Sequence, residues 1–179
     1  DRGVTFSSLR LNPSDISAEG WCETFDIGIN EPMGIAISKA IITSKKKYGK
    51  EFFIDELIGS IESDAKTADQ TKDAIIYRLE MAKSWDMFQQ LQYCDIGENL
   101  NTSVVNILDL SVIDPGRYGK RPLILATLCR DIFMKRVAAR RREELGLSPG
   151  LPKVWLFIDE CHQFAPSGKA SLAKETLIR

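Results

Sequence analysis

The chain has 179 residues and a formal net charge of -1 at neutral pH. A charge so close to zero gives no general attraction for nucleic acid, so any basic surface must be local. The hydrophobic fraction is 44% and the charged fraction 27%, which is typical of a soluble globular protein. No apolar run is long enough to cross a bilayer and no signal peptide is visible, so we expect no membrane association.

The cysteines are widely separated and show no Cys-x-x-Cys spacing. They are Cys22, Cys94, Cys129 and Cys161, and His162 is the one histidine of the sequence. This composition argues against a Cys/His zinc site, because such sites draw four ligands from closely spaced pairs. Free thiols in a reducing compartment are the simplest explanation, and we predict a cytoplasmic protein.

The first half of the chain begins with a predicted strand and continues as helices. Residues 4–11 alternate loosely between polar and apolar side chains, and Asn12 or Ser14 can cap the first helix. Apolar residues at helical spacing then predict four helices, near residues 16–25, 32–48, 53–61 and 69–88. Successive helices with no strand between them indicate a small helical bundle.

Two features of this bundle have alternative interpretations. Trp85 and Phe88 lie at helical spacing and are expected in the bundle core rather than in a base-stacking surface. The basic run Lys45–Lys47, followed by Lys50, fits the negative end of a helix dipole, and a DNA-facing patch is the alternative.

The second half has the pattern strand, helix, strand. Apolar segments at 104–111 and 154–158 flank a long helical pattern from Arg121 or Pro122 to about Leu145. This order predicts a right-handed unit with two parallel strands. We therefore expect an α/β fold, with residues 1–11 and 101–179 in a parallel-sheet core and residues 12–100 as an inserted helical bundle. A last helix is predicted to begin near Ser167 or Lys169.

Carboxylates follow both predicted strands of the second half. Asp159 and Glu160 come directly after Ile158, and Asp109 lies near the end of the earlier segment. Ligands bind beyond the carboxyl ends of parallel strands, so these acids are candidate site residues. Asp159 could hold Mg²⁺, and Glu160 could accept a proton from an attacking water. Ordinary solvated acids at a strand end, or an Asp109 that caps the next turn, are the alternatives.

The segment Val154–Pro166, with its Asp-Glu-Cys-His-Gln-Phe-Ala-Pro sequence, resembles the Walker B region of the HerA/FtsK superfamily of P-loop ATPases. It is most similar to the HerA-like DNA translocases, and looser similarity extends to residues 104–111 and 11–16. The resemblance implies ATP and Mg²⁺ as cofactors, with Asp159 coordinating the metal through water and Glu160 activating the hydrolytic water. Asp109 would help to position the metal or the γ-phosphate.

The same resemblance implies two further roles and a set of partners. His162 would sense the nucleotide state, or serve as a structural hydrogen-bond partner. Arg179 would act in trans as an arginine finger. The parent would form a hexamer around double-stranded DNA and work in DNA end processing with a NurA-like nuclease.

The phosphate-binding loop of such ATPases, Gly-x-x-x-x-Gly-Lys-Ser/Thr, is absent from the sequence. Gly168-Lys169 fails the pattern, because Gln163 stands where the first glycine should be and Ala170 replaces the hydroxyl residue. The chain also begins at Asp1 without methionine. These observations predict a piece of a longer ATPase that alone binds ATP weakly or not at all.

Three alternative functions remain open from the sequence. One is a conjugation or secretion motor of the same superfamily. Another is a non-enzymatic interaction module that uses the helical bundle. The last is a metal-dependent nuclease, which requires Asp109, Asp159 and Glu160 to converge on metal ions.

Overall fold

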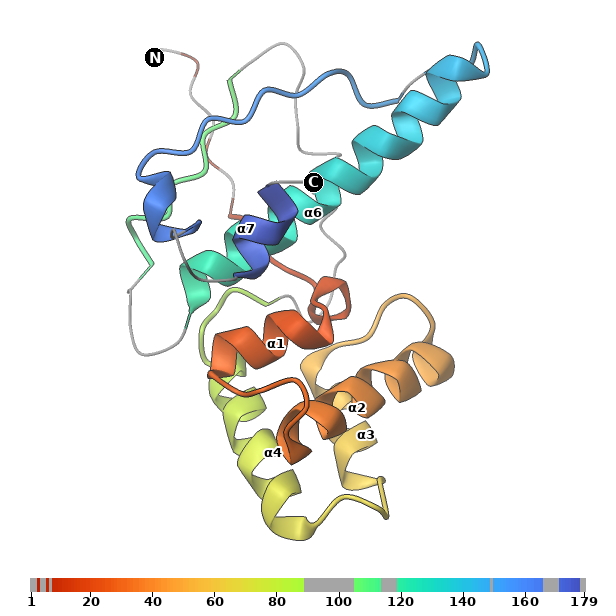
Figure 1. The fold of residues 1–179 in the computed structure, drawn as a ribbon, viewed down its shortest axis with the longest axis vertical. Coiled ribbons are helices and arrows are strands. Elements are labelled where there is room, and N and C mark those ends of the chain that lie inside the picture. The colour runs from red at the N-terminus through yellow and green to blue at the C-terminus, as the bar shows by residue number, and fades with distance from the viewer. Residues whose placement is uncertain are drawn as a thin grey trace.

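The computed structural model describes residues 3, 6, 8–88, 105–113, 119–148, 150–165 and 171–177. Within them the chain forms two short 3₁₀ helices and six α-helices (Figure 1). These are η1 (Pro13–Asp15), α1 (Ala18–Phe25), α2 (Pro32–Tyr48), α3 (Ile54–Glu62), α4 (Asp69–Lys83), α6 (Lys120–Glu144), η2 (Cys161–Gln163) and α7 (Leu172–Leu177).

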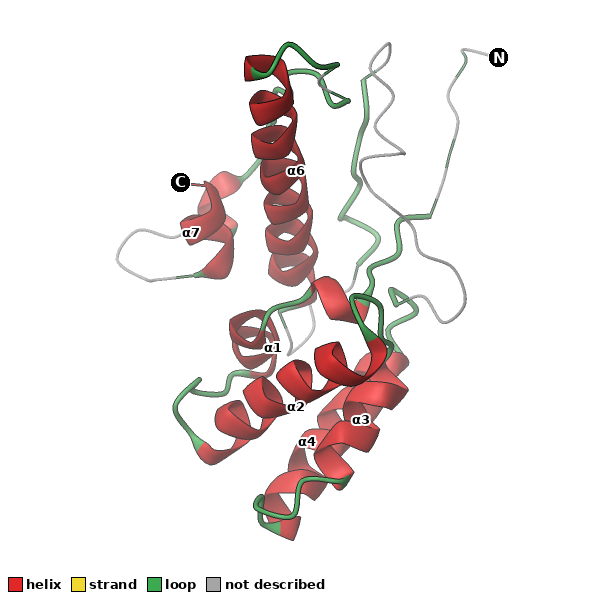
Figure 2. Ribbon diagram, turned by 90° about the vertical axis from the view of Figure 1, so that its right-hand side faces the viewer, coloured by secondary structure: helices red, strands yellow, loops and turns green. Residues whose placement is uncertain are grey.

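The predicted α/β class is wrong, since the described residues are helical and contain no sheet (Figure 2). The one β-bridge among them is isolated and parallel, between Leu11 and Phe88. Segments 105–111 and 154–158 are not strands, and no backbone hydrogen bond joins them. An apolar run shows only that a segment favours burial, whereas a strand also requires a neighbour to accept its backbone hydrogen bonds.

The helices of the first half are confirmed, and their ends have local chemical causes. The Asn12 side chain accepts from Ser14 N at 3.0 Å, and the Ser17 hydroxyl accepts from Gly20 N at the start of α1. Pro32 opens α2, where a missing backbone N–H costs nothing, and Gly49 ends it with φ 85°. Helix α4 ends at Lys83, earlier than the predicted residue 88.

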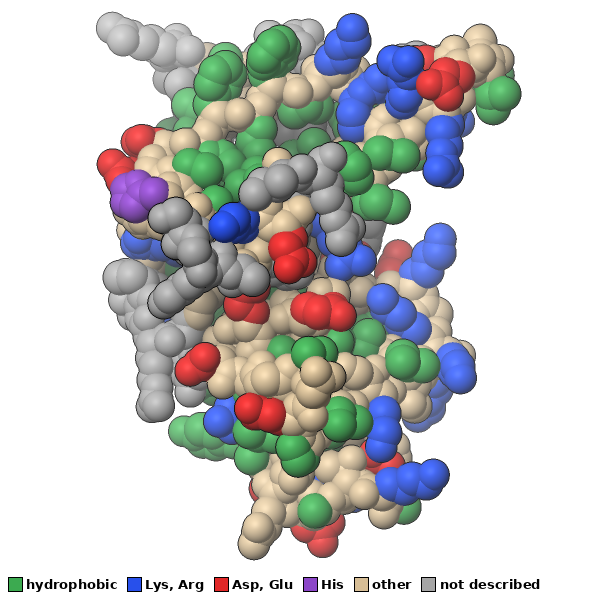
Figure 3. Space-filling view, viewed as in Figure 1, with side chains coloured by type: hydrophobic (Ala, Val, Ile, Leu, Met, Phe, Trp, Pro, Cys, Tyr) green, Lys and Arg blue, Asp and Glu red, His purple; other side chains and the backbone are tan. Residues whose placement is uncertain are grey.

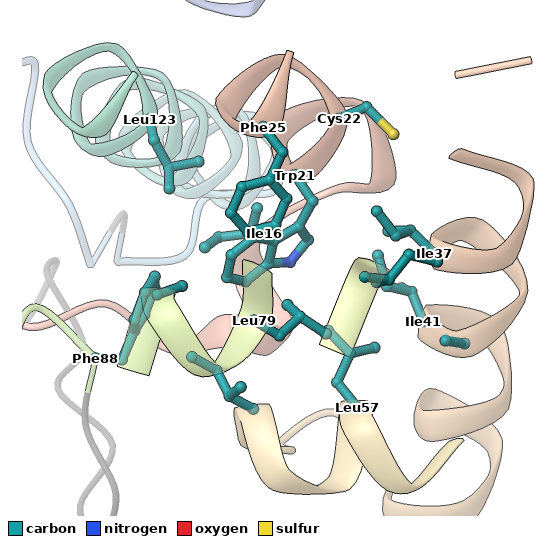
Figure 4. Close-up of a cluster of buried hydrophobic side chains, with 14 of the residues drawn as sticks. Ile16, Trp21, Cys22, Phe25, Ile37, Ile41, Leu57, Leu79, Phe88 and Leu123 are labelled. Atoms are coloured by element: carbon teal, nitrogen blue, oxygen red, sulfur yellow. The ribbon is translucent and has the colours of Figure 1, made fainter. Parts of the chain in front are cut away.

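One apolar core holds α1 to α4 together (Figure 4). Trp21 is fully buried at its centre and stacks on Phe25, with ring centroids 5.5 Å apart. Phe88 lies 5.5 Å from Trp21, and Trp85 packs against the same core, so the predicted core role of both aromatics is confirmed. Burying aromatic rings of this size is the main source of stability for a small helical module.

Helix α6 connects this core to a second one. Its residues Leu123, Ile124 and Leu128 pack into the core of α1–α4. Its residues Leu125, Ala126 and Cys129 form a separate cluster with Phe164 and Ala173. The first half of α6 is therefore buried from two sides, while the second half projects away from the module (Figure 2).

Candidate carboxylate site

Asp159 and Glu160 lie in a tight turn rather than at the end of a strand. Asp159 Oδ1 accepts a hydrogen bond from Glu160 N at 2.9 Å, and Glu160 O accepts from Gln163 N at 2.9 Å. Glu160 adopts the left-handed conformation, with φ 52° and ψ 36°. A non-glycine residue in this region costs of order 1 kcal/mol or more, so the surrounding contacts must hold the turn in place.

Two apolar side chains fix this turn against α6. Ile158 precedes it and Phe164 follows it, and both belong to the cluster formed with Cys129 and Ala173. Phe164 O also accepts a hydrogen bond from the Ser171 hydroxyl at 2.8 Å, just before α7. The turn is thus anchored on both sides, while its carboxylates remain exposed to solvent.

His162 lies beside Glu160 in this turn. Its Nδ1 is 3.3 Å from Glu160 Oε2, and both side chains are more than half exposed. An imidazole at this distance can donate a hydrogen bond to the carboxylate or carry the opposite charge. The structure therefore brings together Asp159, Glu160 and His162 of the predicted site.

Asp109 occupies a second turn of similar form. Its Oδ1 accepts from Ser111 N at 2.8 Å, and its hydrogen bonds to Ser111 lower the pKa of the carboxyl group. Arg121, at the start of α6, donates from Nε to Ile113 O at 2.9 Å and fixes the end of this turn. The alternative role of Asp109, closing a turn, is confirmed as its local structure.

The two turns converge on the same part of α6. Leu110 follows Asp109, Ile158 precedes Asp159, and both apolar side chains pack against the cluster around Leu125. The acids that follow the two predicted strands thus lie over the same stretch of helix, although no sheet aligns them. Arg179 lies outside the described residues.

A cation at this site would have few protein ligands. Within the described part of the chain, no three His, Cys, Asp or Glu side chains form a group that could hold a metal ion. Asp109, Asp159 and Glu160 therefore do not make the metal centre that the nuclease hypothesis requires. Asp159 supplies a hard carboxylate oxygen, and a single such ligand suits Mg²⁺ because this ion keeps several waters and binds phosphate oxygens.

Exposed apolar side chains flank both turns. Trp155 and Phe157 are 85% and 88% exposed, whereas Val154 and Leu156, which alternate with them, are 38% and 46% exposed. Val105 and Ile107, ahead of the Asp109 turn, are each 86% exposed. In segment 154–158, Trp155 and Phe157 are thus almost fully in solvent, and Ile158 is the residue that packs against the cluster of α6.

The sequence gives no direct indication of two residues that position the site, Arg121 and Phe164. The patterns mark Arg121 only as a helix start and Phe164 only as part of a motif. Arg121 donates to the carbonyl oxygens of Ile113 and Ser111, and no local sequence pattern indicates these two contacts. The apolar neighbours of Phe164 are distant in sequence, so no local pattern indicates its anchoring role.

Comparison of the chain with protein-family models, with curated proteins and with solved structures finds no match. The resemblance to HerA-like translocases therefore rests on the sequence motif. None of the helices among the described residues has the length and apolar character needed to cross a membrane.

Proposed function

We propose that this chain is the part of an ATP-driven DNA translocase that carries its catalytic carboxylates. The observation that supports this best is the turn at Asp159-Glu160. A strained left-handed residue, anchored on both sides by Ile158 and Phe164, holds two adjacent carboxylates toward solvent. Strain of this kind persists where the surrounding structure imposes it, and it is concentrated at functional sites.

Each acid has a distinct proposed role. Asp159, whose carboxylate is already oriented by the Glu160 amide, would hold Mg²⁺ through water. Glu160 would orient the attacking water and accept its proton. Bound Mg-ATP would supply the reactive γ-phosphate and the charge that neutralises it in the transition state.

The neighbouring residues have supporting roles in this proposal. His162, 3.3 Å from Glu160, would position that carboxylate and report on the bound nucleotide. Asp109, whose lowered pKa keeps it anionic, would help to orient the metal or its waters. Arg179 would reach the phosphates bound by a neighbouring subunit.

The assembly follows from the motif resemblance. A chain without a phosphate-binding loop needs that loop from elsewhere in its parent, so we expect the complete protein to bind ATP and this chain alone to bind it weakly. The parent would be a hexamer that encircles double-stranded DNA in the cytoplasm. A NurA-like nuclease would act with it at DNA ends.

The test is ATP hydrolysis by the full-length parent, measured with and without duplex DNA. The comparison uses Glu160→Gln and, as a control of the same chemistry, Glu144→Gln, which lies at the exposed end of α6. We expect DNA-stimulated hydrolysis that falls at least about 100-fold in Glu160→Gln and is unchanged in Glu144→Gln.

Other outcomes select other functions. Equal hydrolysis in the parent and Glu160→Gln would remove this carboxylate from the mechanism. Hydrolysis that DNA does not stimulate would favour a secretion motor. Absence of hydrolysis in every protein would leave the helical module as an interaction domain.

A further inference from the structure

We propose that a basic concavity between α2 and α6 binds the phosphate backbone of duplex DNA, an inference that rests on the proposed function for its choice of polyanion. We call this surface the basic notch. Its cations come from the end of α2 and the residues just beyond it, and from the middle and outer part of α6. They are Lys45, Lys46, Lys47, Lys50, Arg130, Lys135, Arg141 and Arg142.

The structure brings these two runs together although they are far apart in the sequence. Lys45 of α2 and both Arg130 and Lys135 of α6 act electrostatically on Asp15, which lies between the two helices in η1. Figure 3 shows Lys and Arg side chains along this edge of the molecule, which is hollowed between the outer half of α6 and the body below it.

Helix geometry separates the charges of α6 into two sides. Arg136 and Arg140 form ion pairs with Glu143 and Glu144, at 2.7 and 2.9 Å. With about 100° per residue, this pair of arginines points away from the line formed by Asp131, Lys135 and Arg142. The two glutamates therefore neutralise one side of the helix and leave the side toward α2 basic.

Several cations of the basic notch have no salt-bridge partner among the described residues. They are Lys45, Lys46, Lys50, Arg130 and Arg141, and all of them are exposed. Apart from Glu143 and Glu144, which pair with Arg136 and Arg140, the acids that interact electrostatically at the notch are Asp15, Glu51 and Asp131. Eight cations against three acids leave an excess of five positive charges on a chain whose net charge is -1.

The dimensions favour an extended polyanion over a small ion. Arg130 and Arg141 share nearly one face of α6 and are separated by about 16 Å along the helix, which equals the rise of about five phosphates of one DNA strand. A hollow with cations on both sides fits the convex sugar-phosphate backbone of a nucleic acid. A lipid bilayer is flat on this scale and would contact only the outer edges of the hollow.

The experiment measures binding of a short fluorescein-labelled DNA duplex to the 179-residue chain by fluorescence anisotropy, without nucleotide. The notch variant carries Lys45→Gln, Arg130→Gln and Arg141→Gln, and glutamine retains the helix propensity of these positions. The control carries Lys66→Gln, Arg140→Gln and Lys153→Gln. It removes the same charge from exposed positions outside the notch.

We expect the notch variant to bind at least about tenfold more weakly, and the control to change by less than about twofold. The slope of log K against log salt should become shallower by about three in the notch variant, since each lost phosphate contact removes about 0.9. For the unmodified chain, about five contacts imply a several-hundredfold loss of affinity between about 50 and 200 mM salt.

Three results would overturn the inference. They are no duplex binding at about 50 mM salt, an equal loss in both variants, or binding to phosphatidylserine vesicles without binding to the duplex. Glu160→Gln separates this inference from the proposed function, because it should leave duplex binding unchanged. Duplex binding through the notch by a parent that does not hydrolyse ATP would support the notch and refute the translocase.

Discussion

Glu160 and His162 form a contact of 3.3 Å between carboxylate and imidazole on a turn whose backbone is left-handed at Glu160. If the imidazole positions the carboxylate, His162→Ala should lower the ATP hydrolysis rate of the parent about tenfold with little change in nucleotide binding. His162→Asn retains a donor and should recover most of the rate. Equal rates in all three proteins would show that the contact has no part in hydrolysis.

Glycine at position 160 should separate stability from activity. Glu160→Gly relieves the positive φ and should stabilise the chain by about 1 kcal/mol, whereas Glu160→Gln should leave its stability unchanged. Both variants should lose hydrolysis in the parent. Urea denaturation followed by circular dichroism measures the first effect, and a stability loss in Glu160→Gly would show that the left-handed turn is not strained.

Asp131 should make the stability of the chain depend on pH. Burial and the nearby Asp15 carboxylate raise the pKa of Asp131 to about 6. The ion pair with Lys135, at 2.8 Å, acts in the opposite direction because it favours the charged carboxylate. The folded state therefore holds this proton more tightly than the unfolded state, and its stabilising effect is lost as pH rises through about 6.

Asp131→Asn should remove that dependence. Relative to this variant, the free energy of unfolding of the unmodified chain should fall by about 1 kcal/mol between about pH 4 and pH 7. This value is reduced for the partial exposure of the side chain. The measurement is urea denaturation of both proteins across this range. A relative gain in stability with rising pH would show that the Lys135 ion pair outweighs burial.

Gly34 lies in the first turn of α2, where the backbone of Gly28 and Ile29 approaches it closely. A Cβ at this position would clash with the carbonyl oxygen of Gly28 and lie 2.7 Å from the carbonyl oxygen of Ile29. Gly34→Ala should therefore destabilise the chain by about 2 kcal/mol, because backbone must move. Gly59→Ala is the control. Gly59 belongs to α3 and a Cβ there would meet open space, so this substitution should be neutral or stabilising.

Trp155 and Phe157 should contribute little to the stability of this chain despite their apolar character. They are 85% and 88% exposed, so Trp155→Ser with Phe157→Ser should change the unfolding free energy by less than about 0.5 kcal/mol. Leu57→Ala, in the fully buried core, should cost about 2–5 kcal/mol. A large loss in the double variant, measured by urea denaturation, would show that segment 154–158 is buried in solution.

The helices were predictable because their signals are local. Pro32 and Gly49 mark the two ends of α2, and the spacing of Ile54, Leu57, Ile58 and Ile61 gives the buried face of α3. Trp85 and Phe88 lie in the core as predicted, although α4 ends at Lys83 and the helical periodicity behind that prediction does not reach them. Such patterns are set within one or two helical turns and do not depend on distant partners.

The absence of a sheet from the described residues was not predictable from apolar runs, because pairing is a property of two segments. Residues 154–158 have the composition of a buried strand, yet Trp155 and Phe157 face solvent. The sequence order Asp159, Glu160, His162 did indicate side chains that the structure brings together in one turn. The left-handed turn that presents these residues depends on tertiary contacts that the sequence does not display. The same holds for the cations of α2 and α6 that act together on Asp15.

Helix α6 links the carboxylate turn to the proposed basic notch. Its buried half carries the Ile158 and Phe164 contacts of the carboxylate turn, and its outer half carries Arg141 and Arg142 of the basic notch. The outer half is about 20 Å long, so a tilt of about 10° at the buried half would displace its tip by about 3 Å. A small repacking around Phe164 would thus be amplified into a displacement as large as a contact distance.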